Sequence, residues 1–322
     1  MSPLSQTVSP TRGRAPMFTR HDANPLLTAA DWPYPVSAVC NPGATLVDGE
    51  TVLLCRVEDR RGLSHLTVAR SLDGVTDWRV DPKPLIAPDG DDPLLAWGAG
   101  DARITRVDEL EAWVITYTAL GYGGPCVAVA LTRDFTSVEH LGVAMPPDNT
   151  DAALLPRRID GEFVLLHRPI SPMSRRGDVW LSRSRDLRYW YGGKTLLSTR
   201  PVPWWDSEHI GVGPPPIETD AGWLCVYHGV KRASAAAAPM YHVGLVLLDR
   251  DDPTRVLRRS ADWVFGPGAP YEVSGDAPNV VYPTGLVHDE AAGELRLYYG
   301  AADACVAMAT AEVEEVLGWG LG

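Results

Sequence analysis

Polar side chains recur in this sequence next to glycine and proline, at the points where short apolar runs begin. Five such segments are Asn41-Pro42-Gly43-Ala44, Gly100-Asp101-Ala102-Arg103, Asn149-Thr150-Asp151-Ala152, Gly213-Pro214-Pro215-Pro216 and Tyr282-Pro283-Thr284-Gly285. Further polar groups stand where later apolar runs end, namely Arg56, Tyr117, His167, Arg168, Tyr227, His228 and Asp303. Together these groups supply the donors and acceptors that a ligand rich in hydroxyl groups requires. If the fold brings the segments together, the sequence predicts a sugar-binding site, and Trp97, Trp204 and Trp205 could add apolar platforms beside it.

The elements that must position these residues are short β-strands. Apolar runs alternate with Gly, Pro and Asp, and a helix is expected only near residues 311–317. One unit recurs, in which a short strand, a polar turn and a stronger strand are followed by a third strand and an Asp turn. The hairpins at 44–54 and 153–166 both contain Asp-Gly, a strong turn signal. Similar hairpins begin at Arg103, Pro216 and Gly285, and the Asp turns stand at Asp73, Asp134, Asp186 and Asp249.

Five such units at a period of roughly 50–60 residues are each too small to bury their own faces. We therefore predict an all-β fold, a five-bladed β-propeller, which closes its ring of sheets and leaves little exposed edge. An irregular β-sandwich is the alternative. The innermost strand of each blade begins near the axis, so the five polar segments would converge on an axial pocket. Residues 1–20 are expected to be a mobile lead-in, and residues 21–322 a single catalytic domain.

Composition excludes several other classes of function. The chain has 322 residues and a net charge of -12, which gives no electrostatic help in binding nucleic acid or an anionic membrane. The five cysteines are scattered without a Cys-x-x-Cys pair, so we expect buried thiols and neither a disulfide scaffold nor a metal site. The N-terminus lacks the apolar stretch of a signal peptide, and no run is long enough to cross a membrane. A cytoplasmic location is expected.

At these residues the sequence resembles glycoside hydrolase family 130, the mannoside phosphorylases and β-mannosidases. The matching segments run in order along nearly the whole chain and include Asn41-Pro42-Gly43-Ala44, Gly100-Asp101-Ala102-Arg103, Leu166-His167-Arg168-Pro169, Gly213-Pro214-Pro215-Pro216, Tyr227-His228-Gly229 and Gly300-Ala301-Ala302-Asp303. The resemblance implies the same five-bladed propeller. It also implies that Asp101 is the proton donor and that Asn41, Arg56 and Asp303 hold the sugar whose bond is cleaved. The Glu and Pro that flank this Asp in the family motif are absent here.

The resemblance also bears on the choice between water and phosphate as the attacking group. Phosphorylases of the family bind phosphate with three cationic positions, of which this chain retains Arg168. Thr150, followed by Asp151, and His209, preceded by Glu208, stand at the other two. Because phosphate binding requires compensating positive charge, these departures favour hydrolysis.

We therefore predict an enzyme that hydrolyses β-mannosides with inversion, with Asp101 as general acid and Glu208 or Asp151, in that order, as general base. The predicted substrate-binding residues are Asn41, Arg56, Arg103, Tyr117, His167, Arg168, His209, Tyr227, His228 and Asp303. One alternative is a phosphorylase that uses inorganic phosphate as co-substrate and releases mannose 1-phosphate; another is a non-catalytic sugar-binding propeller. The predicted partner is a mannose-containing oligosaccharide, with no cofactor, metal, nucleic acid or membrane, and homo-oligomer formation stays open.

Overall fold

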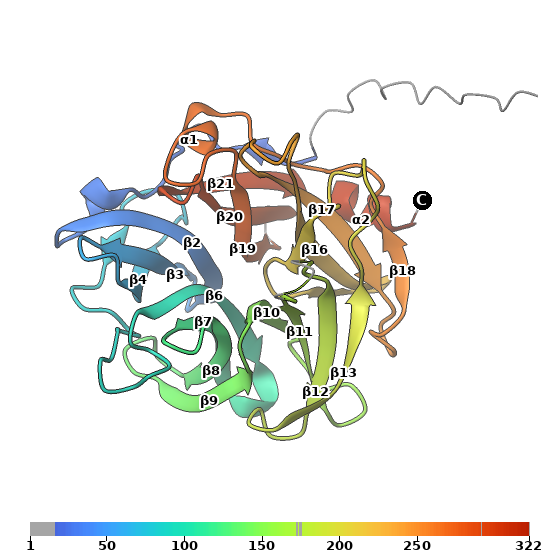
Figure 1. Cartoon of the computed structure of the whole chain (residues 1–322), viewed down its shortest axis with the longest axis horizontal. Helices are drawn as coiled ribbons and strands as arrows, with labels where there is room; N and C mark the ends of the chain where they lie inside the picture. Colours follow the sequence, from blue (N-terminus) through green and yellow to red (C-terminus); the bar gives the residue numbers. More distant parts are fainter. Residues whose placement is uncertain (1–16, 172, 174–175, 291, 322) are drawn as a thin grey trace, which may run out of the picture.

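The computed structural model describes residues 17–171, 173, 176–290 and 292–321, and it is built almost entirely of antiparallel β-strands (Figure 1). The all-β prediction is confirmed. The strands form one eight-stranded sheet, one five-stranded sheet and two four-stranded sheets. The eight-stranded sheet contains two successive antiparallel units that are joined at one parallel bridge, between Ser64 and Gly98. The chain is thus organised as five units in sequence order.

The first two units share the large sheet. The first contains β2 (Val36–Val47), β3 (Glu50–Asp59), β4 (Ser64–Ser71) and β5 (Arg79–Val80). The second contains β6 (Gly98–Val107), β7 (Ala112–Leu120), β8 (Cys126–Thr132) and β9 (Glu139–Met145). Within each unit, strands that are consecutive along the chain are paired antiparallel.

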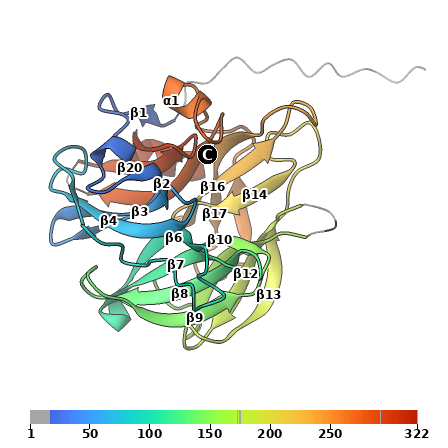
Figure 2. The same ribbon diagram turned by 60° about the vertical axis from the view of Figure 1, so that its left-hand side comes forward.

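The other three units form separate sheets. The third contains β10 (Asn149–Leu154), β11 (Phe163–Pro169), β12 (Val179–Ser184) and β13 (Trp190–Leu197). The fourth contains β14 (His209–Val212), β15 (Ile217–Thr219), β16 (Gly222–Lys231), β17 (Met240–Leu248) and β18 (Val256–Arg259). The fifth contains β19 (Val281–Asp289), β20 (Glu294–Ala301), β21 (Cys305–Glu312) and the N-terminal β1 (Thr19–Arg20). Figures 1 and 2 show the five units set around a common centre.

The helical elements are short. They are η1 (Ala29–Asp31), η2 (Asp108–Leu110), α1 (Pro270–Val273) and the C-terminal α2 (Val313–Leu321). The helix expected near 311–317 therefore exists but begins two residues later, because β21 continues to Glu312 and still pairs with β20 there.

The turns that defined the repeat have the predicted chemistry. Asp48 and Gly49 both have positive φ, of 51° and 84°, and so do Asp160 and Gly161, at 53° and 80°. A two-residue hairpin loop of this kind requires positive φ at both positions. The Asp turns also agree with one another, because the carboxylates of Asp73, Asp134, Asp186 and Asp249 each accept backbone N–H bonds from the residues two and three positions later.

The N-terminal boundary differs from the prediction. Residues 1–16 of the expected lead-in lie outside the described part of the chain. Met17 and Phe18 are buried in the apolar cluster that the fourth and fifth units share, and Thr19 and Arg20 pair with β21. The sequence signal was weak because two strand residues are too few to show an alternating pattern. The folded domain thus includes residues 17–20, and both ends of the described chain belong to one unit.

Apolar side chains between the sheets form five buried clusters. Each of them combines residues of neighbouring units, as where Leu166 and Val164 pack with Trp223 and Cys225. All five cysteines are buried and free, as predicted. No helix in the described part of the chain has the length and apolar character needed to span a membrane.

Candidate active site

Three of the polar segments share one backbone irregularity. The pairing of β2 with β3 shifts between Cys40 and Gly43, that of β6 with β7 between Gly100 and Arg103, and that of β10 with β11 between Thr150 and Ala153. The first residue inside each bulge has a left-handed backbone, with φ of 46° at Asn41, 52° at Asp101 and 51° at Asp151. Asn and Asp tolerate this conformation better than most residues. The three residues therefore occupy equivalent positions in successive units.

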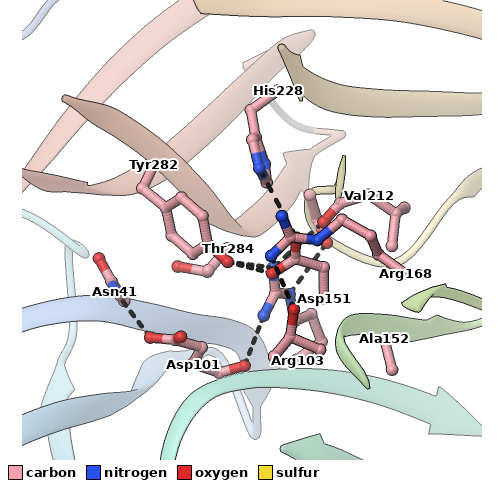
Figure 3. Close-up of polar contacts among 12 residues, drawn as sticks. Asn41, Asp101, Arg103, Asp151, Ala152, Arg168, Val212, His228, Tyr282 and Thr284 are labelled. Carbon is pink, nitrogen blue, oxygen red and sulfur yellow. Dashed lines mark hydrogen bonds and ion pairs between the residues drawn. The ribbon is translucent and has the colours of Figure 1, made fainter. Parts of the chain in front are cut away.

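Asn41 and Asp101 both line a pocket of about 450 Å³, and their side chains lie next to each other (Figure 3). Asn41 Nδ2 donates to Asp101 Oδ1 at 2.7 Å, and Arg56 Nη1 lies 3.5 Å from the same oxygen. The charged and aromatic residues that line this pocket are Arg56, Asp101, Arg168, Tyr241, Asp276, Tyr282 and Asp303. The structure thus brings together the predicted Asn41, Arg56, Asp101, Arg168 and Asp303. We refer to this cavity as the Asp101 pocket.

The carboxyl group of Asp303 in the Asp101 pocket has a raised pKa. Burial raises the pKa of its carboxyl group, the nearby Asp101 raises it further, and Arg56 opposes both. Asp303 also has a positive φ, of 51°, in the turn between β20 and β21. Two carboxyl groups and one arginine can bind several sugar hydroxyls at once, because each carboxylate accepts up to about four hydrogen bonds.

Arg103 and Asp151 lie in a buried layer next to the Asp101 pocket. Arg103 is 1% exposed, and its Nη1 donates to the backbone carbonyl of Asp101 at 2.6 Å. The Asp151 carboxylate is fully buried and lies 2.7 Å from Arg168 Nε. Although burial opposes ionisation, the arginine charges outweigh it, and the pKa of Asp151 falls to about 2. These surroundings do not suit the predicted role as a general base, because a carboxylate held so firmly in its ionised form takes up a proton poorly.

A second cavity, of about 690 Å³, adjoins the Asp101 pocket and shares Arg168 and Tyr241 with it. We refer to it as the arginine cavity. Its charged and titratable lining residues in the described part of the chain are Arg168, Arg176, Arg200, Glu208, His209, Arg232 and Tyr241. Burial lowers the pKa of His209 to about 4, so this histidine is neutral at pH 7. The lining side chains therefore carry a net charge of +3, from four arginines and one glutamate.

The surroundings of the arginines in the arginine cavity are well defined. Arg200 Nε contacts both oxygens of the buried Asp206, at 2.8 and 3.0 Å, and its guanidinium stacks on Trp204 at 4.1 Å. Arg232 Nη1 lies 2.5 Å from Glu208 Oε2. Glu208 thus lines the arginine cavity rather than the Asp101 pocket, and its carboxylate is tied to an arginine.

Three predicted binding residues lie away from both cavities. Tyr117 is 4% exposed and packs in the core between the first two units, where its hydroxyl bonds His140. His167 is held between Asn149 and Ser182. The Tyr227 hydroxyl donates to Asp206 at 3.0 Å. Consecutive residues of a strand point to opposite faces of the sheet. Because Arg168 faces the two cavities, its neighbour His167 points away from them.

His228 is part of the buried layer. It is 1% exposed, and its Nε2 lies 3.6 Å from Asp151 Oδ2. Its ring stacks on Tyr241 and lies 4.8 Å from the ring of Tyr282. Burial lowers the pKa of His228 to about 3, so it is neutral at pH 7. It therefore supports the lining tyrosines without adding charge.

The structure also adds residues that were not among the predicted site residues. Tyr241 and Tyr282 line the Asp101 pocket, and Arg200 and Arg232 line the arginine cavity. Tyr282 opens the fifth polar segment, so its position in the repeat was a usable signal. Arg200 lies in the loop before β14, and Arg232 lies in the loop after β16. The repeat does not extend into these loops, so it does not predict where their side chains point.

Comparison with known proteins places the chain in a family. The sequence profile of glycoside hydrolase family 130, described as beta-1,4-mannooligosaccharide phosphorylase, matches residues 13–320. The chain belongs to glycoside hydrolase family 130. The predicted resemblance is confirmed, and with it the expectation that the chain is an enzyme of the glycosidase or glycoside phosphorylase type.

Curated relatives of this family 130 protein carry phosphorylase names. A beta-1,4-mannooligosaccharide phosphorylase of Ruminococcus albus is 33% identical over 306 residues, covering 92% of this chain and 89% of the relative. A 1,2-beta-oligomannan phosphorylase of a Thermoanaerobacter species is 32% identical over 303 residues, covering 90% and 95%.

Solved structures agree with this assignment. The beta-1,2-mannobiose phosphorylase of Listeria innocua, solved with beta-1,2-mannobiose, superposes with a TM-score of 0.85 at 28% identity and covers 94% of this chain and 98% of its own. A further family 130 structure comes from work on glycoside hydrolases that target beta-1,2 mannosidic linkages in Candida mannan. It has a TM-score of 0.80 at 27% identity and covers 94% of this chain and 95% of its own. The family thus includes both phosphorylases and hydrolases.

Proposed function

We propose that this protein is a phosphorylase that cleaves β-mannosides with inorganic phosphate and releases mannose 1-phosphate. The sequence favours hydrolysis and predicts phosphorolysis as the alternative. The named relatives that cover most of this chain are β-mannoside phosphorylases, which favours the alternative. The observation that carries the proposal is the arginine cavity, which adjoins the Asp101 pocket and shares Arg168 with it.

The charge of the arginine cavity suits phosphate. Its described lining holds four arginines and one glutamate in a protein whose overall charge is -12, while the buried Asp151 and Asp206 behind the lining pair with Arg168 and Arg200. Charge-assisted hydrogen bonds from guanidinium groups are stronger than neutral ones and match the geometry of phosphate oxygens. Thr150 and His209 carry no charge at positions where the family resemblance implies cations. Arg176, Arg200 and Arg232 supply positive charge to the same cavity from other parts of the chain.

The proposed reaction follows from this arrangement. Asn41, Arg56 and Asp303 hold the mannosyl unit in the Asp101 pocket, and Asp101 donates its proton to the glycosidic oxygen as the bond from that oxygen to the anomeric carbon breaks. A phosphate oxygen supplied from the arginine cavity attacks the anomeric carbon on the opposite face. The β-linkage is thereby inverted to α-mannose 1-phosphate, and the shortened sugar leaves with the proton. Because phosphate is itself the nucleophile, no general base is required.

The architecture that supports this site is, in our proposal, a five-bladed β-propeller. Five antiparallel units follow one another around a common centre (Figure 1), and the three bulged polar residues occupy equivalent positions in the first three. In the fifth unit β1 pairs with β21, so residues from both ends of the chain share one sheet. Such a connection fastens the first and last parts of a ring to each other.

Hydrolysis is the second candidate. It is favoured by the neutral Thr150 and His209 and by the carboxylate of Glu208 in the arginine cavity. In this case Glu208 would activate a water molecule, and Asp151, which is buried and ion-paired, would not. The two candidates make opposite predictions for Glu208→Gln. Loss of a base lowers turnover by about 10²–10⁴-fold, whereas loss of a negative charge beside Arg232 strengthens phosphate binding.

The deciding experiment incubates the protein with a panel of β-mannosides, with and without phosphate, and measures free mannose against mannose 1-phosphate. We expect turnover to require phosphate and to yield mannose 1-phosphate, and we expect Glu208→Gln to retain turnover with a lower KM for phosphate. Release of free mannose independent of phosphate, together with an inactive Glu208→Gln variant, would establish the hydrolase. No turnover of any mannoside under either condition would favour a non-catalytic sugar-binding protein.

A further inference from the structure

The Asp151 carboxylate is the common partner of the charged groups beneath both cavities (Figure 3). Its side chain has no exposed surface, and Arg168 Nε lies 2.7 Å from Oδ2. On the other oxygen, Arg103 Nη2 lies 3.5 Å away and the Tyr282 hydroxyl donates a hydrogen bond. The carboxylate therefore joins two arginines and one tyrosine from three different units of the fold.

One of these contacts leads to the proposed proton donor. Arg103 Nη1 donates to the backbone carbonyl of Asp101 at 2.6 Å, while its other nitrogens donate to the carbonyls of Gly213 and Val212 at 3.2 and 3.1 Å. Arg103 is 1% exposed, so its charge needs a buried counter-ion. Asp151 supplies this counter-charge. The left-handed backbone of Asp101 is thus braced by an arginine that Asp151 neutralises.

The other contact leads to the arginine cavity. Arg168 lines both cavities, and its side chain is only 10% exposed. Its Nη2 donates to Thr150 Oγ1 at 2.7 Å, while its Nε faces Asp151. Two adjacent residues of β10 therefore set the plane of this guanidinium. Because bidentate recognition of an anion depends on that plane, its orientation decides where an anion is held.

We propose that Asp151 is a positioning residue that fixes Asp101 and Arg168 in one mutual arrangement, through Arg103 on one side and a direct ion pair on the other. This inference rests on the proposed function, in which Asp101 protonates the leaving group and Arg168 contributes to phosphate binding. The residue touches neither sugar nor phosphate. Its pKa of about 2 keeps it ionised throughout the neutral range, which suits a fixed counter-ion.

The test is the isosteric Asp151→Asn variant, studied in the full chain with a β-1,2- or β-1,4-linked mannobiose and inorganic phosphate. Misplacement of a catalytic group by about 1 Å can cost roughly 10²-fold in rate, and we expect a fall in kcat of this order. The KM for phosphate should rise about tenfold, because the plane of Arg168 is no longer fixed. The KM for mannobiose should change little, since Asn41, Arg56 and Asp303 keep their places.

A matched control is Glu272→Gln. Glu272 is also a fully buried carboxylate that binds an arginine and a tyrosine, at 2.6 Å from Arg20 and 2.7 Å from the Tyr299 hydroxyl, and it lines neither cavity. It should lower thermal stability and leave kcat and both KM values of the folded protein unchanged. A folded Asp151→Asn variant that behaves in the same way would overturn the proposal.

Thr150→Val serves if Asp151→Asn does not fold. It removes the hydroxyl that shares Arg168 with Asp151 and keeps the buried ion pairs, so the KM for phosphate should rise severalfold while kcat stays near that of the wild type. An unchanged KM for phosphate would refute the claim that β10 orients the Arg168 guanidinium for phosphate binding. The wild-type product is measured in parallel. If the wild type releases free mannose, the proposed function fails. The role of Asp151 is then tested by the kcat of Asp151→Asn for hydrolysis: a fall in kcat supports it, and an unchanged kcat refutes it.

Discussion

Replacement of Asp101 by asparagine tests the central assignment of the site. The amide has the shape of the carboxyl group but cannot deliver a proton, and general-acid assistance contributes about 10²–10⁴-fold to rate. At 1.36 kcal/mol for each tenfold change, the expected loss of transition-state stabilisation is about 3–5 kcal/mol. We therefore expect kcat on unactivated mannobiose to fall by that factor, in phosphorolysis and in the reverse synthesis alike.

The structure indicates a much smaller effect of Asp101→Asn on stability. The asparagine oxygen can keep the 2.7 Å bond from Asn41 Nδ2. The contact of 3.5 Å with Arg56 loses its charge, but Asp303 remains to balance this arginine. A change on the order of 1 kcal/mol in the free energy of unfolding follows. The pKa of Asp303 should also fall, because the charge of Asp101 contributes to raising it.

The assay compares mannobiose with an aryl mannoside whose leaving group needs no proton, in wild type, Asp101→Asn and the control Asp276→Asn. Asp276 lines the same pocket, so the control removes one negative charge without removing the proposed acid. Asp101→Asn should lose far more activity on mannobiose than on the aryl mannoside, and the control should not discriminate between them. Near wild-type turnover of mannobiose by folded Asp101→Asn would refute the assignment.

Two further predictions concern packing and pH. In Gly300→Ala, the new Cβ would lie 1.7 Å from Asn41 Oδ1 and 2.8 Å from the backbone nitrogen of Asn41; displacement of Asn41 should cost roughly 10²-fold in kcat/KM, and a kinetically normal variant would show that Asn41 is not held there. Burial lowers the pKa values of His209 and His228 to about 4 and about 3, so both contribute stability above pH 6.5 that is lost as the pH falls toward 4. Urea unfolding at pH 7 and pH 5 should therefore differ by roughly 2 kcal/mol per histidine, and an unchanged unfolding free energy would contradict their buried neutral state.

Local sequence was sufficient for the features that depend on short-range chemistry. The Asp-Gly hairpins and the Asp turns could be predicted because a positive φ or an Asx turn is favoured by the residue types themselves. The repeat of these signals gave the all-β class and the order of the units. It also predicted that Asn41 and Asp101 would meet, because equivalent residues of a repeated unit occupy equivalent places around a centre, whereas the place of Asp303 beside them was implied by the family resemblance.

The tertiary structure decided the roles that depend on partners far away in the chain. The sequence position of Asp151, next to Thr150, predicts a general base. In the structure its carboxylate is buried and held ionised by ion pairs with Arg103 and Arg168. Glu208 faces the arginine cavity because Arg232, from the loop after β16, pairs with it. Neither contact is visible in a sequence, since the field at a carboxylate is set by charges that the fold brings within about 4 Å. Sequence thus determined which groups are present near the centre, and packing determined which of them remain free to act.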